Sequence, residues 1–211
     1  MTELEKMIVG KLYDPADHEI TAIQNRAHEL CRIYNSLSGN TADMKARDLI
    51  LRQLLPKIDF EKTLYVFLLE PIFFDMGINT VIGSGFYANA HLTVLDSSPV
   101  TIGNGVQLGA NVSLLTATHP LRYQERNFHT WPDGRSTSLL YSKPITICSN
   151  CWLASNVTVT GGVTIGEGSV IGAGSVVTRD IPENVFAAGV PCRVIRPITE
   201  DDKLSDDLFV D

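Results

Sequence analysis

The sequence predicts a mainly β fold, namely a parallel β-helix of hexapeptide repeats with an N-terminal helical segment and one long extruded loop. Between residues 145 and 181 a short apolar side chain returns at every sixth position, at Ile147, Leu153, Val159, Ile165, Ile171 and Val177. An α-helix would show a period of about 3.6 residues, and a half-buried strand a period of about 2. A period of six is typical of short strands joined by tight corners, which stack as the coils of a β-helix.

Two further observations extend the repeat over most of the chain. A second, weaker register lies two positions before the first, and the residue after the apolar position is usually small, as at Ala154 and Gly166. The same register occurs earlier, at Ile82, Ala88, Val94, Ile102, Leu108 and Leu114. A slip in phase after Val94 predicts a bulged corner at residues 96–99. Each coil takes three hexapeptides and completes its core only against its neighbours, so the repeats predict about four to five stacked coils.

The N-terminal part of the chain predicts two helices beside the coil. Apolar side chains recur at spacings of three and four from Ile20 to Tyr34, with Asp14 expected as N-cap and Pro15 at the first helical position. A second helix is expected to follow a break at residues 38–41 and to end at Pro56. Residues 64–76 are expected to form the strands that open the coil.

Breaks in the six-residue register and a change in charge divide the rest of the chain into segments. The repeat is interrupted completely between Leu115 and Pro144, which predicts a large loop outside the stack. The last repeats are followed by an extended segment and an acidic tail, in which a short helix through Leu204, Leu208 and Phe209 is expected. We therefore expect a helical cap at residues 1–60, a β-helix at 61–197 with its loop at 116–144, and an acidic tail at 198–211.

Composition and charge exclude several classes of protein. The 211 residues are 44% hydrophobic and 19% charged, which is typical of a folded domain. The net charge of −7 argues against nucleic acid or an anionic membrane as the main partner. No apolar run approaches the roughly 20 residues that span a bilayer, and the first ten residues carry no secretory signal. With the four cysteines interpreted as reduced thiols, these features predict a cytoplasmic protein.

The long loop is where function is expected, because long loops in compact domains are usually functional when they are ordered. It opens with Thr118-His119-Pro120, which places His119 at its root, next to the rigid stack. A histidine with an ordinary pKa of about 6.5 suits the role of general base. The other histidines, at positions 18, 28, 91 and 129, are interpreted as surface or packing residues. Cys148 and Cys151 supply only two ligands, so we expect packing in the coil and no metal site.

Several segments stand in an order that resembles one enzyme family. They are Phe86-Tyr87-Ala88-Asn89, Thr118-His119-Pro120, Pro144-Ile145-Thr146-Ile147, Val163-Thr164-Ile165-Gly166 and Ala188-Gly189-Val190-Pro191. With Gly10-Lys11-Leu12-Tyr13 and the two helices, they resemble the maltose and galactoside O-acetyltransferases of the hexapeptide acyltransferase superfamily. The resemblance covers nearly the whole chain and implies a left-handed β-helix. It also implies acetyl transfer from acetyl-CoA to a hydroxyl of a sugar or similar acceptor, in homotrimers with active sites between subunits.

The resemblance implies roles for individual residues as well. His119 would remove the proton of the acceptor hydroxyl, and Asn89, with a backbone N–H near Ser155, would stabilise the oxyanion. The acceptor would contact Asp17, Asp75, Tyr87 and Asn89. The co-substrate acetyl-CoA would contact Trp152, Ser155, Ala173, Thr178, Arg179, Arg193 and Arg196, with the arginines suited to its phosphates.

The chain departs from the family pattern in two places. Ser97 stands where the family has a further acceptor aspartate, with Asp96 beside it. The loop is longer and lacks the usual acid before Lys143. Trp131 and Tyr123 in this loop could stack on an acceptor, although anchoring of the loop by its own aromatic side chains is the simpler interpretation.

Three alternatives remain on the same fold. N-acetyl transfer to an amino sugar, or acylation of an antibiotic, would use the same coil and donor. A non-catalytic scaffold would need neither His119 nor the arginines. A metal-dependent enzyme of the carbonic anhydrase type would need three histidine ligands, for which only His91, His119 and His129 lie near the coil, and it would not carry this helical cap.

Overall fold

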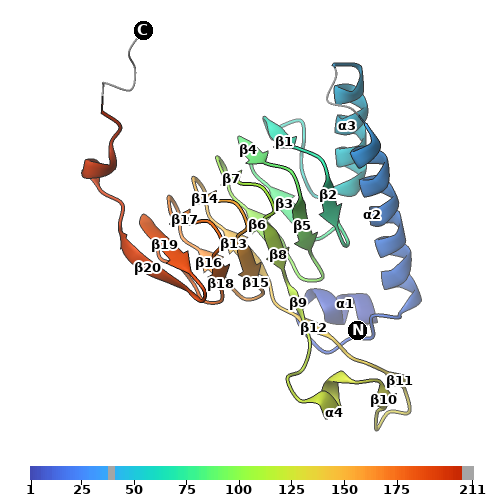
Figure 1. Ribbon diagram of the computed structural model, residues 1–211. Coiled ribbons are helices and arrows are strands. Elements are labelled where there is room, and N and C mark those ends of the chain that lie inside the picture. The colour runs from blue at the N-terminus through green and yellow to red at the C-terminus, as the bar shows by residue number, and fades with distance from the viewer. Residues whose placement is uncertain (38–40, 206–211) are drawn as a thin grey trace.

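The predicted fold class is confirmed by a computed structural model, which describes residues 1–37 and 41–205. Within these residues the chain forms four complete three-stranded coils, followed by an incomplete fifth coil and the strand that begins a sixth. The coils stack as a parallel β-helix, and the long helices lie beside the end of the stack where the first strands are found (Figure 1).

Three sheets form the sides of the coil. The seven-stranded sheet contains, in spatial order, β1 (Val66–Leu68), β4 (Phe86–Ala88), β7 (Gln107–Leu108), β14 (Trp152–Leu153), β17 (Val170–Ile171), β19 (Val185–Gly189) and the antiparallel β20 (Cys192–Pro197). The five-stranded sheet contains β2 (Ile72–Phe74), β5 (Leu92–Leu95), β8 (Ser113–Leu115), β15 (Thr158–Thr160) and β18 (Val176–Val177). The four-stranded sheet contains β3 (Thr80–Ile82), β6 (Val100–Ile102), β13 (Ile145–Ile147) and β16 (Thr164–Ile165).

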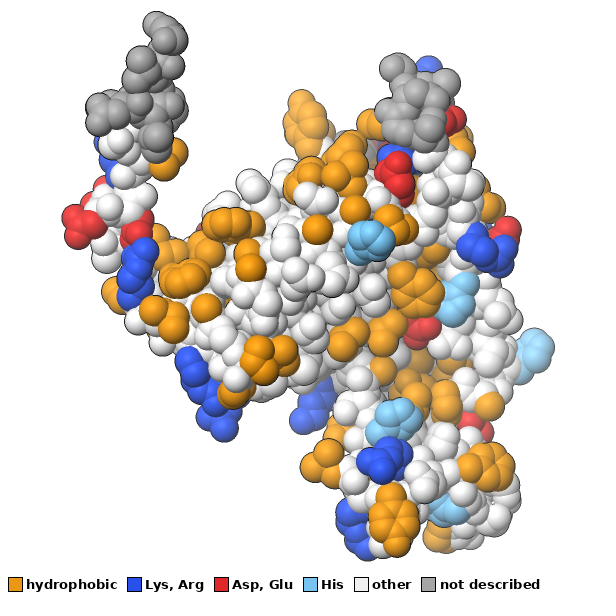
Figure 2. Space-filling model, viewed as in Figure 1, with side chains coloured by type: hydrophobic (Ala, Val, Ile, Leu, Met, Phe, Trp, Pro, Cys, Tyr) orange, Lys and Arg blue, Asp and Glu red, His pale blue; other side chains and the backbone are white. Residues whose placement is uncertain are grey.

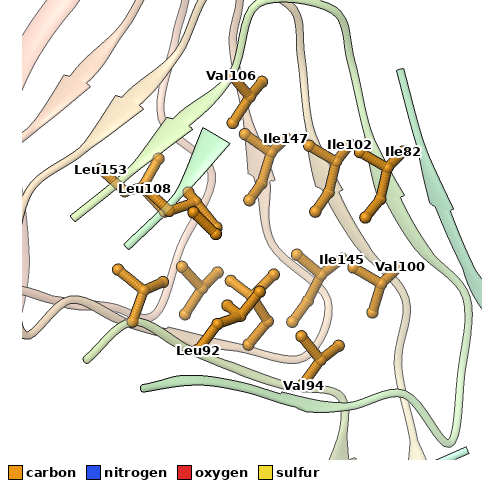
Figure 3. Close-up of a cluster of buried hydrophobic side chains, with 14 of the residues drawn as sticks. Ile82, Leu92, Val94, Val100, Ile102, Val106, Leu108, Ile145, Ile147 and Leu153 are labelled. Atoms are coloured by element: carbon orange, nitrogen blue, oxygen red, sulfur yellow. The ribbon is translucent and has the colours of Figure 1, made fainter. Parts of the chain in front are cut away.

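The side chains of the six-residue register fill the inside of the coil. Strands pair in register, so that Ile82, Ile102, Ile147 and Ile165 form one row, and each is at most 2% exposed. Figure 3 shows Ile82, Ile102 and Ile147 side by side in this row, with Ile145 and Val100 in the next. Full burial of an aliphatic side chain stabilises a fold by about 1.5–3 kcal/mol, so this repeat supplies most of the core energy.

Cys151 occupies one of the inward positions, as predicted. It is 1% exposed, and burial raises the pKa of its thiol to about 11. Cys148 is partly buried, and no disulfide joins the two. The pair therefore packs in the coil.

Before β1 the described residues form α1 (Glu3–Ile8), α2 (His18–Ser36) and α3 (Thr41–Leu54). Helix α1 was not predicted, because six residues are too few to show a helical period. The predicted start of α2 is wrong: Asp17 is the N-cap, and its Oδ1 accepts from the N–H groups of Glu19 and Ile20. Asp14 instead closes a local turn by accepting from the N–H of Ala16, which delays the helix. Helix α3 ends just before Pro56, as predicted, whereas most of the expected break at residues 38–41 lies outside the described residues.

The interruption at residues 116–144 is an arm that leaves the stack beside the N-terminus (Figure 1). It contains β9 (Ala117–Thr118), α4 (Tyr123–Arg126), β10 (His129–Thr130), β11 (Ser136–Thr137) and β12 (Tyr141–Ser142), with β9 paired to β12 and β10 to β11. The Trp131 ring packs at a tilt against His129, with ring centroids 4.3 Å apart, and Trp131 donates Nε1–H to the carbonyl of Thr137. Anchoring of the arm by its own aromatics is thus confirmed for Trp131, whereas Tyr123 is exposed.

After β20 the chain forms a short 3-10 helix, η1 (Glu200–Asp202). The expected helix through Leu208 and Phe209 lies largely outside the described residues. Across residues 1–37 and 41–205, no helix combines the length and apolar character needed to cross a bilayer.

Candidate active site

His119 lies at the root of the arm, directly after β9. The root is clamped on two sides: Thr116 Oγ1 donates to the carbonyl of Leu95 at 2.6 Å, and Ser142 Oγ donates to the carbonyl of Met7 at 2.7 Å. The His119 side chain is exposed and has no hydrogen-bond partner among the described residues. An imidazole on a fixed backbone, with both ring nitrogens free, is available for proton transfer.

A cavity of about 290 Å³ opens beside the arm root. It is lined by Leu115, Ala117, Thr118, Tyr141, Lys143, Thr160 and Gly161. Thr118 pairs with Tyr141 across β9 and β12 and immediately precedes His119. His119 itself does not line the cavity, which is connected to the predicted base only through the preceding residue, Thr118.

Asp75 follows β2 and contacts helix α2. Gln24 Nε2 lies 3.2 Å from Asp75 Oδ1 and 3.1 Å from Oδ2, and His28 Nε2 lies 3.2 Å from Oδ1. The Asp75 side chain remains 17% exposed. The sequence interpretation missed Gln24 and placed His28 among the packing residues, although a spacing of four puts both on one helix face.

Asn89 lies at a different corner of the coil from His119. We call the turn between the seven- and five-stranded sheets, which holds residues 89–91, 109–111, 154–156 and 172–174, the asparagine corner. Asn89 Oδ1 accepts from the N–H of Ala90 at 2.7 Å, which leaves the Nδ2 hydrogens without a partner in the described part of the chain. Ser155 and Ala173 lie at the same corner, where the N–H of Gly174 donates to the Ser155 carbonyl.

The opposite turn, between the five- and four-stranded sheets, is the arm corner. It holds residues 75–79, 96–99 and 178–180, and the arm leaves from it. Thr178 and Arg179 are exposed at this corner, on the same side of the five-stranded sheet as Asp75 and the root of His119.

The aromatic residues of the predicted site lie on the outer face of the seven-stranded sheet. Tyr87, Gln107, Trp152, Val170 and Phe186 form one outward row through the strand register. Tyr87 stacks on Phe67 with centroids 6.0 Å apart, and Trp152 is 51% exposed. A cavity of about 370 Å³ adjoins Trp152 and is lined by Trp152, Val170, Phe186, Arg196, Ile198 and Asp202.

The predicted phosphate-binding arginines differ in their surroundings. Arg196 is held by the tail, because its Nη1 and Nη2 donate to the two Asp202 oxygens at 2.7 and 2.6 Å. This guanidinium lowers the pKa of Asp202 to about 2. Arg193 Nη1 donates to the carbonyl of Cys192, and Arg179 has no ion-pair partner among the described residues. Figure 2 shows basic side chains near the C-terminal end of the coil.

Asp17, a predicted acceptor residue, caps α2, as described above. Ser97, which stands where the family has an acceptor aspartate, is 3% exposed; burial raises the pKa of the nearby Tyr13, and Ser97 opposes that rise. Neither observation indicates that Asp17 or Ser97 binds an acceptor. Within the described ranges, no three His, Cys, Asp or Glu side chains are grouped as metal ligands.

One chain therefore brings the predicted residues together in three groups rather than one. Asp75, His119, Thr178 and Arg179 lie at the arm corner; Asn89, Ser155 and Ala173 at the asparagine corner; and Tyr87, Trp152, Arg193 and Arg196 on the seven-stranded sheet. The five-stranded sheet separates the two corners, and a strand of three or four residues spans about 10 Å.

The chain matches two family models. Residues 6–59 match the maltose acetyltransferase hexapeptide capping motif, and residues 144–179 match the bacterial transferase hexapeptide (six repeats). The galactoside O-acetyltransferase of Escherichia coli (strain K12) is 37% identical over 204 residues, which cover 96% of this chain and 93% of that protein. The chain belongs to the maltose and galactoside O-acetyltransferase family.

Solved structures of this family share the fold over nearly the whole chain. A maltose O-acetyltransferase from Clostridium difficile 630 is 38% identical with a TM-score of 0.83, covering 95% of this chain and 99% of that one. A galactoside acetyltransferase in complex with coenzyme A is 35% identical with a TM-score of 0.80, covering 97% of this chain and 95% of that one. The predicted family is thus confirmed, and the chain is a hexapeptide-repeat acetyltransferase.

Proposed function

We propose that this chain transfers the acetyl group of acetyl-CoA to a hydroxyl of a sugar-like acceptor, with His119 as general base. The observation that carries the proposal is the clamped arm root, which presents the exposed imidazole of His119, without a partner, directly after Thr118, a residue that lines a cavity. The coenzyme A complex of a 35% identical acetyltransferase supports the donor. The names of the maltose and galactoside enzymes support the acceptor class.

The reaction needs one proton acceptor and one oxyanion site. His119 takes the proton of the acceptor hydroxyl as that oxygen attacks the thioester carbonyl carbon. The C–S bond of the tetrahedral intermediate then breaks, and the imidazolium returns the proton to the departing CoA thiolate. The products are an acetyl ester and CoA, and no covalent enzyme intermediate is required.

The oxyanion site draws on the asparagine corner. The Nδ2 hydrogens of Asn89 are free, and its Oδ1 is held by Ala90, so the amide is oriented before the substrate arrives. Preorganised donors of this kind stabilise a developing oxyanion more than mobile ones, because they need no reorganisation. A backbone N–H near Ser155 at the same corner is the second proposed donor.

We place coenzyme A along the side of the coil that joins this corner to the tail. Trp152, Ser155 and Ala173 would contact the pantetheine arm. Arg193 and Arg196 would meet the phosphates of the cofactor on this side, and Thr178 and Arg179, which lie at the arm corner, would contact the cofactor from a neighbouring copy of the chain. Arg196 would have to exchange its contact with Asp202 for the ligand.

We further propose a homotrimer with active sites between subunits. His119 and Asn89 lie at different corners of one chain, so a neighbouring copy is the simplest way to bring the base and the oxyanion donor together. Apolar surface for such contacts is supplied by exposed Phe67, Tyr87 and Trp152 on the coil, and by Leu121 and Phe128 on the arm.

We also propose that the protein is cytoplasmic, since its four cysteines, Cys31, Cys148, Cys151 and Cys192, are free thiols.

Acceptor-dependent thiol release from acetyl-CoA tests the proposal. With maltose, methyl β-galactoside, glucosamine and glycerol as acceptors, we expect the chain to prefer a sugar hydroxyl, and His119→Ala to lower the rate about 10²–10⁴-fold. His18→Ala, which removes an exposed imidazole from the start of α2, is the control and retains the wild-type rate. Wild-type activity in His119→Ala, or no release with any acceptor, would refute the proposed function.

A further inference from the structure

The side of helix α2 that faces the coil carries two polar side chains one turn apart, Gln24 and His28. Both contact Asp75, which is 51 and 47 residues away in the sequence. His28 is 36% exposed and packs against Phe73, with ring centroids 4.9 Å apart and an interplanar angle of 37°. Figure 2 shows histidine side chains on this face, along the helix and the arm.

The contacts leave specific hydrogen-bonding positions free. An ionised carboxylate only accepts hydrogen bonds, so the 3.2 Å contact requires His28 Nε2 to carry a hydrogen and donate it to Asp75 Oδ1. A neutral His28 then has its lone pair on Nδ1, which has no partner among the described residues. Asp75 Oδ2 receives only the Gln24 amide, at 3.1 Å, and retains capacity for another donor. The cluster therefore offers two separate acceptors, namely Asp75 Oδ2 and His28 Nδ1 on the side of the imidazole that is turned away from Asp75.

Two separate acceptors beside an aromatic ring suit a polyhydroxylated ligand. A pyranose carries hydroxyls around its rim, so different hydroxyls can donate to Asp75 Oδ2 and to His28 Nδ1, while the apolar face of the sugar ring can pack on Phe73. A carboxylate-bearing acceptor would be repelled by the charge of Asp75. The predicted ligand is thus a neutral sugar or polyol bound through hydroxyls that do not react.

The cluster lies at the same corner as the predicted base. Asp75 stands at the arm corner, where its N–H donates to the carbonyl of Val94 in the neighbouring coil. Tyr13 links this region to the arm. It belongs to the same buried cluster as Met76, the residue after Asp75, and its backbone pairs with Leu140 of the arm. Leu140 is followed by Tyr141, which pairs with Thr118, the residue before His119. A bound acceptor can therefore be held by Asp75 and His28 and deprotonated by His119.

We propose that His28 is a specificity-determining residue, which binds a non-reacting hydroxyl of the sugar acceptor together with Asp75. This inference rests on the proposed acetyltransferase function and adds a residue to its acceptor site. Because His28 acts on a hydroxyl that does not react, its loss changes acceptor binding rather than the chemical step.

Acceptor saturation kinetics on the full chain provide the first test. His28→Phe keeps an aromatic ring against Phe73 but removes both nitrogens, and we expect the KM for methyl β-galactoside and maltose to rise about tenfold. The kcat and the KM for acetyl-CoA stay within about twofold of wild type. His18→Phe, on the same helix and exposed, is the matched control and changes none of these values. Circular dichroism and thermal unfolding of each variant confirm that it is folded.

Deoxy analogues of methyl β-galactoside identify the hydroxyl. The analogue that lacks the hydroxyl bound by His28 is expected to raise the KM of the wild type. It should not raise the KM of His28→Phe further, because that variant has already lost the same contact. An unchanged acceptor KM in His28→Phe with an active wild type would overturn the inference and leave the proposed function standing. A fall in kcat with an unchanged acceptor KM would also overturn it, because His28 would then act in the chemistry.

A binding measurement separates the two proposals if turnover fails. The His28 imidazole signals, assigned by comparison with His28→Phe, are followed by NMR while methyl β-galactoside or maltose is added without acetyl-CoA. A saturable shift with no thiol release would support the acceptor site and refute the acetyltransferase proposal. Absence of both the shift and thiol release would overturn both.

Discussion

A buried carboxylate, Asp96, lies at the corner between β5 and β6 and holds the turn between β2 and β3 of the preceding coil. Its Oδ1 accepts from the N–H groups of Met76 and Gly77 at 2.8 and 3.1 Å. Its Oδ2 accepts from the N–H of Asn79 at 3.3 Å and from the Thr80 hydroxyl at 2.9 Å. Burial raises the pKa of Asp96, and the surrounding donors oppose that rise. The sequence predicts a bulged corner here, but only the structure shows that the aspartate satisfies the turn of the preceding coil.

We expect Asp96→Ala to lower the free energy of unfolding by about 3 kcal/mol, because three backbone N–H groups lose their acceptor in a buried turn. Asp96→Asn keeps one oxygen and should cost less. Urea denaturation measures both changes. Asp180, at the equivalent corner of a later coil, is exposed and accepts from the N–H of Thr164 at 2.7 Å, so Asp180→Ala is the matched control. Equal losses for Asp96→Ala and Asp180→Ala would contradict a special role for burial.

The arm is attached to the N-terminal segment by a network around Glu3. Glu3 accepts from Arg135 Nη1 at 3.0 Å and from the N–H of Asp14 at 2.7 Å, and it pairs with Lys6. The hydroxyl of Thr137 donates to Asp14 Oδ1 at 2.9 Å. The element that bears His119 is therefore positioned by contacts with residues more than 100 positions earlier in the chain.

We expect the attachment of the arm to the N-terminal segment to weaken at acidic pH. Burial alone would raise the pKa of Glu3, but the hydrogen bonds with Lys6 and the N–H of Asp14 and the charge of Arg135 outweigh it, and the net pKa is lowered. A carboxyl whose pKa is lower in the folded than in the unfolded state stabilises the fold above its unfolded pKa, about 4.3–4.5. That contribution is lost as the pH falls through the folded value.

Trp131 in the arm reports this loss by fluorescence. The chain has two tryptophans, so Trp152→Phe leaves Trp131 as the single reporter. We expect its emission to change as the pH falls below about 4.5, and Glu3→Gln to show the altered emission already at pH 7. Glu29→Gln, on the exposed side of α2, serves as control. An identical titration in Glu3→Gln and the parent would show that Glu3 does not hold the arm.

The separation of the two corners makes a prediction about the whole assembly. If each site combines His119 of one subunit with Asn89 of a neighbour, two inactive variants can complement each other. In trimers refolded from an equal mixture of His119→Ala and Asn89→Ala chains, about a quarter of the sites contain both residues. We therefore expect the mixture to recover about a quarter of the wild-type rate of thiol release, while each variant alone stays inactive.

Sedimentation of the mixture confirms that trimers have formed before activity is measured. Recovery of activity only in the mixture supports sites between subunits. Trimers without recovery would place His119 and Asn89 in the same chain's site, and a monomeric wild type would refute the proposed assembly.

The candidate site was predictable only in part, residue by residue. His119 could be selected from its place at the root of the arm, whereas Asn89 was selected through the resemblance of Phe86-Tyr87-Ala88-Asn89 to the family. The roles of Asp17 as helix cap and of Asp202 as partner of Arg196 were not predicted, because each depends on where a helix or the tail comes to rest. His28 was interpreted as a surface or packing residue, and its contact with Asp75 was not predicted, because that contact arises where α2 packs on β2.

The sequence by itself determined the coil, its stacking and the point from which the arm leaves. A six-residue period is a local property, and every coil repeats the same packing problem, so a single chain carries the signal many times. Tertiary structure alone decided which side chains meet across the cap, the arm and the tail. Those contacts join segments far apart in the chain, where no repeat relates one residue to the other, and packing sets their geometry.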